Sequence, residues 1–307
     1  MDIDQYAAFL PAARHHATVP PESTWLPWRG RRVHIARALD PTAPIRMIVV
    51  HGGGGYSGAL WPLARLVAEQ GVEVLSPDMP LYGYTEEPNP GAVRYGDWVD
   101  LLCDIVTEEH RRDDRPLVLF GASMGGMLAY EAAARTGDVA AVLATCLLDM
   151  SDPAALSAAS RWKVSGRLSA AALRIAGAAL GSVRVPIRWI ADMSAMSNNP
   201  ALAKLCADDR RGGGAKVPLG FLSSWVNYPH TAPEQYRGAP VTLVHPAADA
   251  WTPPQRSIAF LQRISAPTRT VLLDNCGHYP IEEPGLTQLE QTVRDTLTAV
   301  AEQADRR

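Results

Sequence analysis

The sequence predicts an α/β protein built on a doubly wound, mostly parallel sheet, with a helical cap inserted after the sixth strand. Short apolar runs without polar alternation recur along the chain, and such runs are typical of strands buried on both faces of a parallel sheet. Helical segments separate these runs, as expected when strands are parallel. From Asp149 to Arg237 no clear buried strand is visible. An insertion of about 90 residues is far too long to be a loop and predicts a subdomain.

The individual elements follow from the same patterns. The chain begins with a polar, proline-interrupted segment that contains a short helix near residues 5–14. Residues 25–38 alternate around Gly30, which predicts a β-hairpin of two antiparallel edge strands. The remaining strands are expected at residues 45–50, 72–75, 116–120, 139–147, 241–244 and 270–273, and the helices of the core at residues 59–70, 97–110, 124–135, 254–264 and 285–303.

The long interruption divides the chain into three parts. We expect residues 1–148 to form the first part of the core, residues 149–238 the helical cap, and residues 239–307 the second part of the core. Open α/β sheets bind ligands at the carboxyl ends of their strands. The cap is therefore expected to cover that edge.

A candidate nucleophile lies in Gly121-Ala122-Ser123-Met124-Gly125, between a predicted buried strand and a predicted helix. In this context G-x-S-x-G is typical of a sharp turn that holds the serine hydroxyl above the sheet. The serine backbone is strained there, and side chains at Gly121 and Gly125 would collide with the neighbouring strand and helix. We therefore predict that Ser123 is a nucleophile.

A second glycine-rich segment, His51-Gly52-Gly53-Gly54-Gly55, follows the predicted strand at residues 45–50. Its amides could bind phosphate or a developing oxyanion. The phosphate interpretation needs G-K-[ST] or G-x-G-x-x-G, and neither pattern is present. The oxyanion interpretation is favoured, because the amide after the nucleophile would supply a second donor. We predict an oxyanion hole formed by Gly53, Gly54 and Met124.

A serine nucleophile needs a base and an acid that orients the base. His278 lies after the last predicted strand and is the expected base, with His245 as its competitor. Asp249 follows the strand at residues 241–244 and gives the chain order Ser, Asp, His. Asp149, after the preceding strand, is the alternative acid. Asp78 lies in a Pro/Gly loop, where an aspartate more often accepts hydrogen bonds from nearby amides.

These segments together resemble the α/β-hydrolase family, in its capped serine esterase and lipase branch, and the layout is similar to monoacylglycerol lipases and lysophospholipases. The specific matches are the glycine run after His51, the pentapeptide around Ser123, Asp249 before Trp251-Thr252-Pro253, and Gly277-His278. The resemblance implies hydrolysis of carboxylic esters through an acyl-enzyme. A thioesterase, a C–C bond hydrolase, an aminopeptidase and a cofactor-free haloperoxidase share the same constellation, and a ligand receptor or scaffold is the alternative that is not an enzyme.

Composition narrows the remaining expectations. The formal net charge of −3 suggests no nucleic-acid partner. The four cysteines form no pair or Cys/His cluster with metal-ligand spacing, so we expect no metal, no cofactor and a reduced, cytoplasmic protein whose partner is a small acyl ester. Oligomeric state is left open. The cap is basic between residues 151 and 190, through Arg161, Lys163, Arg167, Arg174, Arg184 and Arg188. A solvated helix face and peripheral contact with anionic lipid both explain this charge.

Overall fold

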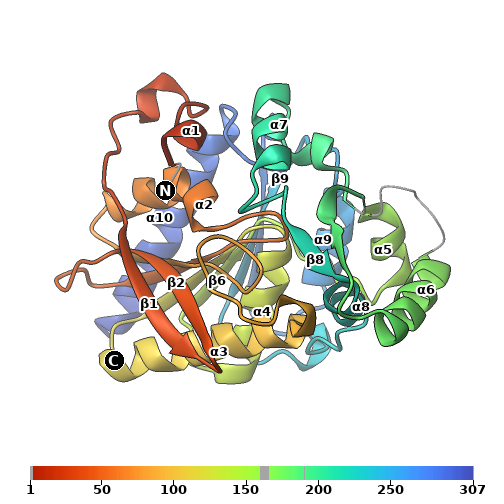
Figure 1. The fold of residues 1–307 in the computed structure, drawn as a ribbon. Helices are drawn as coiled ribbons and strands as arrows, with labels where there is room; N and C mark the ends of the chain where they lie inside the picture. Colours follow the sequence, from red (N-terminus) through yellow and green to blue (C-terminus); the bar gives the residue numbers. More distant parts are fainter. Residues whose placement is uncertain (1–2, 160–165, 190, 307) are drawn as a thin grey trace.

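Eight strands form one sheet in the computed structural model, which describes residues 3–159, 166–189 and 191–306 (Figure 1). The strands are β1 (Glu22–Trp28), β2 (Arg31–Ala38), β3 (Arg46–Val50), β4 (Glu73–Pro77), β5 (Leu117–Gly121), β6 (Ala141–Ala144), β9 (Val241–Pro246) and β10 (Thr268–Leu273). Their order across the sheet is β1-β2-β4-β3-β5-β6-β9-β10. Strand β2 is antiparallel to both of its neighbours, and the other pairs are parallel. The mostly parallel sheet is therefore confirmed.

The N-terminal segment differs in detail from the prediction. The expected helix is split into α1 (Ile3–Ala7) and a 3-10 turn at Ala12–Arg14. Pro11 explains the break, because the residue before a proline is disfavoured in helical conformation. The hairpin of β1 and β2 is confirmed, and its two turn residues, Arg29 and Gly30, have φ of 45° and 79°. Positive φ at both positions is the geometry of a tight type I′ turn.

The helices of the core lie in two layers on either side of the sheet (Figure 1). They are α2 (Ser57–Ala68), α3 (Tyr95–Arg112), α4 (Met124–Thr136), α9 (Pro254–Leu261) and α10 (Gly285–Ala304). Helices α2 and α10 pack on the face that carries Met47 and Val49 of β3. Helices α3 and α4 pack against each other. The central strands β3, β5 and β6 are buried on both sides, as their unbroken apolar sequences predict, whereas the edge strand β10 is mostly exposed.

The segment between β6 and β9 holds α5 (Pro153–Ala159), α6 (Gly166–Ala179), α7 (Pro200–Asp208) and α8 (Leu219–Val226). It also contains two short antiparallel strands, β7 (Arg184–Pro186) and β8 (Lys216–Pro218). The expectation of helices without a clear buried strand therefore misses a small sheet, since three-residue strands are too short to show a period. Arg161, Trp162 and Lys163 lie outside the described residues, and so does the side chain of Arg167.

A buried ionic network occupies the amino-terminal edge of the sheet. Arg46 begins β3 and Glu73 begins β4, and both side chains are almost completely buried. Glu73 accepts hydrogen bonds from Arg37 at 3.0 Å and Arg115 at 2.8 Å. Arg46 contacts the carboxylate of Glu109, at the end of α3, at 3.2 Å. Burial would raise the pKa of Glu109, but the neighbouring arginines outweigh it and the pKa is lowered. This edge is held by paired charges.

Candidate active site

The turn at Ser123 has the strained geometry that its sequence predicts. Ser123 lies between β5 and α4 with φ of 55° and ψ of −124°, a conformation that side chains rarely adopt. A Cβ atom on Gly121 would lie 2.2 Å from the carbonyl oxygen of Gly125, and one on Gly125 would lie 2.3 Å from that of Val50. A Cβ on Gly126 would lie 2.0 Å from the carbonyl oxygen of Cys146. Glycine is therefore required at all three positions by the lack of space around the turn.

Thr145 also holds this turn, and the sequence analysis does not identify it. The backbone amide of Ser123 donates to Thr145 Oγ1 at 2.9 Å, and the amide of Thr145 donates to the carbonyl of Gly121 at 3.0 Å. Strand β6 ends at Ala144 and not at residue 147 as predicted. The chain turns toward Ser123 at that point. The available signal was a threonine in the otherwise apolar segment of residues 139–147.

Ser123, His278 and Asp249 are brought together across the carboxyl ends of three strands. His278 Nε2 lies 2.9 Å from Ser123 Oγ, and His278 Nδ1 lies 2.8 Å from Asp249 Oδ2. The side chains of His278 and Asp249 are 3% and 1% exposed, so little water competes for their hydrogen bonds. With a proton on Nδ1, the ring donates to the carboxylate and accepts from the serine hydroxyl. In this arrangement the imidazole is in position to accept the proton of the serine hydroxyl.

The Asp249 carboxylate is held in its charged form by its own loop. The amides of Trp251 and Thr252 donate to Oδ1 at 2.8 and 2.9 Å, and the Thr252 hydroxyl donates to Oδ2 at 2.6 Å. Burial would raise the pKa of Asp249, but the charge and hydrogen bond of His278 and the bonds from Thr252 outweigh it, and the pKa falls to about 2. In the sequence Thr252 is noted only as part of the segment after Asp249, although a hydroxyl three residues after an aspartate is a usual turn partner.

The alternative acids and the alternative base have other partners. Asp149 Oδ1 lies 3.6 Å from His230 Nδ1 and accepts from the amide of Ser151 at 2.9 Å. Asp78 accepts from the amides of Ser57 at 2.6 Å and Tyr84 at 2.8 Å, which is the hydrogen-bonding function expected for it.

His245 is buried within β9, where its Nδ1 donates to the carbonyl of Pro246 at 3.0 Å. Burial lowers its pKa. His278, and not His245, is the histidine whose ring accepts the hydrogen bond from the Ser123 hydroxyl.

The glycine run after β3 forms a tight turn beside Ser123. The amide of Gly55 donates to the carbonyl of Gly52 at 3.1 Å, and Gly54 has φ of 83°, a value that favours glycine. His51 holds the turn from the side of the sheet. Its Nδ1 donates to the carbonyl of Gly52 at 2.7 Å, and its Nε2 accepts from the amide of Met79 at 2.9 Å. Burial lowers the pKa of His51, which keeps this ring neutral.

The two predicted glycine donors differ in their surroundings. Gly53 lines the same cavities as Ser123, and a Cβ on Gly53 would lie 3.2 Å from Met124 Cε. Gly54 instead lines only the smaller of the two cavities that Ser123 and Gly53 share. Gly53 is therefore the better placed of the two to face a substrate bound at Ser123.

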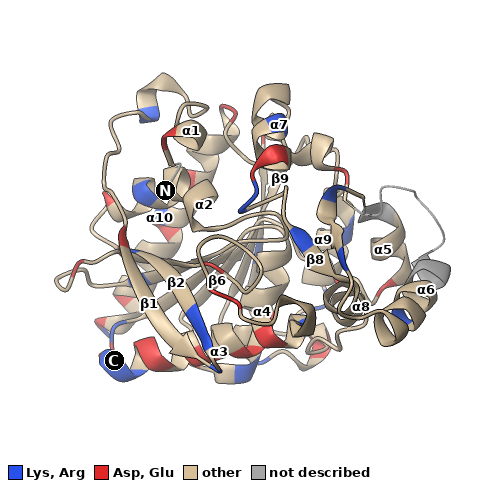
Figure 2. Ribbon diagram, in the orientation of Figure 1, with Lys and Arg blue, Asp and Glu red and all other residues tan. Residues whose placement is uncertain are grey.

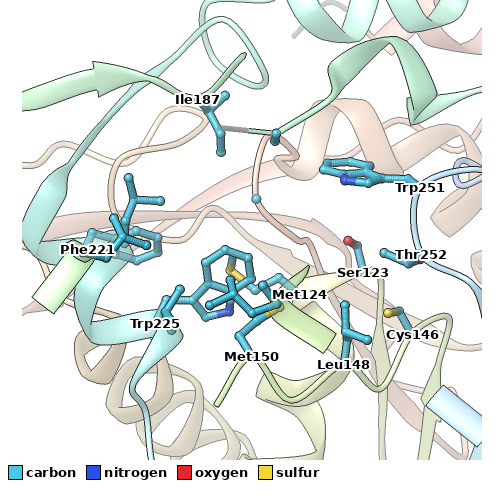
Figure 3. Close-up of a pocket in the computed structure, with 16 residues that line it drawn as sticks. Ser123, Met124, Cys146, Leu148, Met150, Ile187, Phe221, Trp225, Trp251 and Thr252 are labelled. Carbon is cyan, nitrogen blue, oxygen red and sulfur yellow. The ribbon is translucent and has the colours of Figure 1, made fainter. Parts of the chain in front are cut away.

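Two apolar cavities meet at Ser123. The larger has a volume of about 120 Å³ and lies between the core and the insertion. Figure 3 shows the Ser123 hydroxyl pointing into it, with Trp251 on one side and Leu148 and Met150 on the other. The smaller, of about 70 Å³, is lined by the glycine turn, His278, Tyr279 and residues of α2. No Asp, Glu, Lys or Arg side chain lines either cavity among the described residues. The site is therefore suited to uncharged groups.

The aromatic and methionine residues of the insertion lie in several different places. Trp225 and Phe221 of α8 border the larger cavity, and Met196 borders the smaller. Tyr228 packs against the rings of Tyr95 and His230. Trp189 lies on the surface with 59% of its area exposed.

Charge and apolar surface coincide on one part of the insertion. Residues 153–191 contain six Lys or Arg and no Asp or Glu, and Figure 2 shows red concentrated elsewhere, for example on α3. Four of the large apolar side chains that are exposed lie in this segment, namely Ile175, Leu180, Val183 and Trp189. Within the described part of the chain, no helix has the length and apolarity needed to cross a membrane.

Comparison with known proteins gives a consistent assignment of the fold. The model of the alpha/beta hydrolase family matches residues 47–287. A soluble variant of monoglyceride lipase from Saccharomyces cerevisiae is similar in structure, with a TM-score of 0.72, 14% identity, and coverage of 92% of this chain and 97% of the lipase. For monoacylglycerol lipase from Paleococcus ferrophilus these values are 0.66, 18%, 87% and 99%.

Two further relatives come from biosynthetic proteins. A thioesterase domain from the curacin biosynthetic pathway has a TM-score of 0.62 at 17% identity, and the match covers 91% of this chain and 99% of the domain. The AMB antimetabolite synthetase AmbE of Pseudomonas aeruginosa is 36% identical over 124 residues, which are 40% of this chain and 6% of the synthetase. The chain therefore spans only a small part of the length of that protein.

Proposed function

Because the chain belongs to the alpha/beta hydrolase family, we propose that it is a serine hydrolase that cleaves carboxylic esters through an acyl-enzyme on Ser123. The single observation that carries this proposal is the continuous hydrogen-bonded series from Ser123 through His278 to Asp249. The series ends at a hydroxyl that points into an apolar cavity. A nucleophile, its base and the orienting acid are thus within reach of one bound substrate.

The chemistry follows from these positions. The oxygen of Ser123 bonds to the ester carbonyl carbon while its proton moves to His278 Nε2. The amides of Gly53 and Met124 bind the negative oxygen that develops, a contribution of about 3 kcal/mol per donor in well-studied enzymes. The alcohol leaves with the proton from His278. Water then gives a proton to His278 and attacks the acyl carbon, and Ser123 recovers its proton as the acid is released.

The two cavities suggest how the substrate is divided. The leaving oxygen must receive a proton from His278 Nε2, and His278 lines only the smaller of the two cavities. We therefore assign the leaving group to the smaller cavity and the acyl chain to the larger one. Residues 149–238 then act as a cap, since α6 and α8 contribute Leu173 and Trp225 to the acyl cavity.

Labelling with a fluorophosphonate tests the nucleophile. The parent protein is expected to be labelled once, at Ser123, and to hydrolyse an activated ester such as a p-nitrophenyl ester. Ser123→Ala should be neither labelled nor active while remaining folded by circular dichroism. A Ser123→Ala protein with the parent rate would overturn the proposal, and so would a parent protein that is neither labelled nor active.

A panel of activated esters with acyl chains of 2 to about 16 carbons tests the acyl cavity. A preference for chains of eight carbons or more is expected, because the cavity lining is apolar. Leu173→Trp should shift the preference toward shorter chains by filling the cavity. Leu180→Trp is the matched control, since Leu180 is 54% exposed and should leave the chain-length profile unchanged. Identical profiles for both variants would contradict the assignment.

Thioester hydrolysis is the second candidate. It is favoured by the structural similarity to the curacin thioesterase domain. Ser123 and His278 would act on a thioester by the same steps. Esters and thioesters of one acyl chain, assayed side by side, decide between them. A kcat/KM more than about tenfold higher for the thioester would make it the preferred substrate.

We further propose that the basic, apolar surface of the insertion contacts anionic lipid. Arg174, Arg184 and Arg188 supply the charge, and Ile175 and Leu180 supply exposed apolar area. Vesicles that contain phosphatidylserine should sediment the parent protein, and neutral vesicles should not. Ile175→Ser should weaken binding, whereas Leu272→Ser, at an exposed leucine outside the insertion, should not. Equal sedimentation with both kinds of vesicle would contradict this contact. A cytoplasmic location remains our prediction.

A further inference from the structure

The Gly212-Gly213-Gly214 tract of the insertion lies directly against the glycine turn after β3. A Cβ atom on Gly212 would be 2.7 Å from the carbonyl oxygen of Gly54, and a Cβ on Gly54 would be 3.4 Å from Gly213 Cα. Backbone therefore packs on backbone at this contact, and there is no room for a side chain at Gly212. The contact joins the insertion to the turn that contains Gly53.

Lack of space, and not backbone conformation, explains these glycines. None of the three has a positive φ, so an alanine could adopt the same backbone. A Cβ on Gly213 would nevertheless lie 2.4 Å from the carbonyl oxygen of Cys206, and one on Gly214 would lie 2.9 Å from that of Asp209. The tract is thus a closely packed wedge, in contrast to a flexible hinge.

The residues around the tract hold it in place. We call residues 209–214 the wedge loop. The amides of Gly212 and Gly214 donate to the carbonyl of Asp209 at 3.0 and 2.8 Å, and the amide of Gly213 donates to that of Cys206 at 3.1 Å. From the core side, the amide of Gly83 donates to the carbonyl of Arg211 at 2.9 Å. The loop is therefore anchored at both ends as well as to the core.

Asp209 connects this loop to two other parts of the chain. The hydroxyl of Tyr6 in α1 donates to Asp209 Oδ2 at 2.8 Å. Burial and the nearby Asp209 carboxylate raise the pKa of Tyr56, the residue just before α2. One half-buried carboxylate thus joins the N-terminal helix, the wedge loop and the end of the glycine turn.

We propose that the wedge loop positions the oxyanion donor, with Gly212 as the positioning residue that acts through Gly54 on the amide of Gly53. His51 holds the turn from the sheet side, and the wedge loop holds it from the insertion side. The turn has a fixed geometry only when both supports are in place. The insertion therefore completes the oxyanion site in addition to lining the acyl cavity. This inference rests on the serine hydrolase function proposed above.

Gly212→Ala tests the proposal, because its Cβ must push the Gly54 carbonyl. We expect kcat for an activated ester to fall by about tenfold or more, with KM changed by less than about twofold, since a displaced donor affects the transition state and not substrate binding. A trifluoromethyl ketone, whose oxygen becomes an oxyanion when Ser123 adds to it, should bind more weakly by a similar factor. An unreactive ether of the same shape should bind equally well.

Gly177→Ala is the matched control within the insertion. Its Cβ would also meet a close neighbour, Ser223 Cβ at 2.4 Å, but this contact joins α6 to α8 and does not involve the glycine turn. Gly177→Ala should leave kcat and affinity for the trifluoromethyl ketone unchanged, although KM can rise. Asp209→Asn is the second test if Gly212→Ala does not fold, and it should change kcat and ketone affinity in the same direction by a smaller factor.

The outcomes separate this inference from the function on which it rests. If Ser123→Ala keeps the parent rate, the serine hydrolase function is wrong. If Ser123→Ala is inactive while folded Gly212→Ala keeps the parent kcat and the parent affinity for the ketone, only the positioning function is wrong. A loss of kcat in Gly212→Ala without weaker ketone binding would also overturn it.

Discussion

The two ends of the central sheet are built from different interactions. At the amino-terminal edge, Arg46 and Glu73 belong to a buried network of arginines and carboxylates. At the carboxyl-terminal edge, the buried carboxylates of Asp249 and Asp78 are each paired with a histidine, and the cavities beside Ser123 are apolar. At the amino-terminal edge the charged side chains pair with one another, whereas at the carboxyl-terminal edge the hydroxyl of Ser123 faces an apolar cavity. The comparison suggests that stability and reactivity are located at opposite ends of the same strands.

The largest effect is expected at the carboxyl-terminal edge of the sheet, where Ser123 lies. Ser123→Ala should lower kcat by at least about 10⁴-fold, because no other group supplies the nucleophile. Its free energy of unfolding should change by less than about 1 kcal/mol, or increase slightly if strain at the turn is relieved. Ester hydrolysis and urea unfolding measure the two quantities. A large loss of stability would show that the two functions are not separated.

At the amino-terminal edge of the sheet, a substitution should lower stability and leave activity unchanged. Glu73→Gln should destabilise the protein by about 3 kcal/mol, because the buried guanidinium group of Arg37 and the half-buried one of Arg115 lose their charged partner. The kcat of the folded variant should stay at the parent value. Glu108→Gln is the control, since Glu108 is exposed and pairs with the exposed Arg111 at 3.8 Å, and it should cost less than about 0.5 kcal/mol.

Acid should reveal the contribution of Asp249 to stability. Its pKa is lowered from 3.8 to about 2, so its stabilising effect is complete above pH 4 and is lost as the pH falls toward 2, with an expected loss of about 2 kcal/mol. Between pH 4 and pH 2, the free energy of unfolding of Asp249→Asn should fall by about 2 kcal/mol less than that of the parent protein, when unfolding is followed by circular dichroism. Identical curves for both proteins would mean that the carboxylate is not stabilised by its pairing with His278.

The smallest effect concerns Thr145. Thr145→Val keeps the shape of the side chain but removes the acceptor for the amide of Ser123. We expect kcat to fall by about fivefold, since one such hydrogen bond contributes about 1 kcal/mol. Thr145→Ser keeps the hydroxyl and should retain most of the activity in the same assay. Equal rates for the valine and serine variants would show that the turn is held without this bond.

Features that depend on a local sequence pattern could be predicted, whereas features that depend on contacts in the folded protein could not. The order of strands and helices and the turn at Ser123 follow from local patterns, because buried parallel strands have unbroken apolar runs and the turn needs glycines at fixed spacing. The partners Thr145 and Thr252 could not be predicted with the same ease, since each is defined by a hydrogen bond that forms only in the folded protein.

Elements without a periodic pattern were the hardest to predict. Strands β7 and β8 have three residues each, too few to show an alternation. In the sequence the wedge loop resembles a flexible linker. A run of glycines has the same composition whether it is mobile or closely packed. Only its neighbours, such as the carbonyl of Gly54, distinguish the two.

The position of the insertion in the chain has a consequence for folding. Strands β6 and β9 are neighbours in the sheet, with Val142 paired to Val241, although about one hundred residues separate them. Contacts between such distant segments form late, because loop closure is entropically costly. Ser123 lies before the insertion, while Asp249 and His278 lie after it. Esterase activity should therefore appear during refolding only when β9 and β10 have docked onto the sheet.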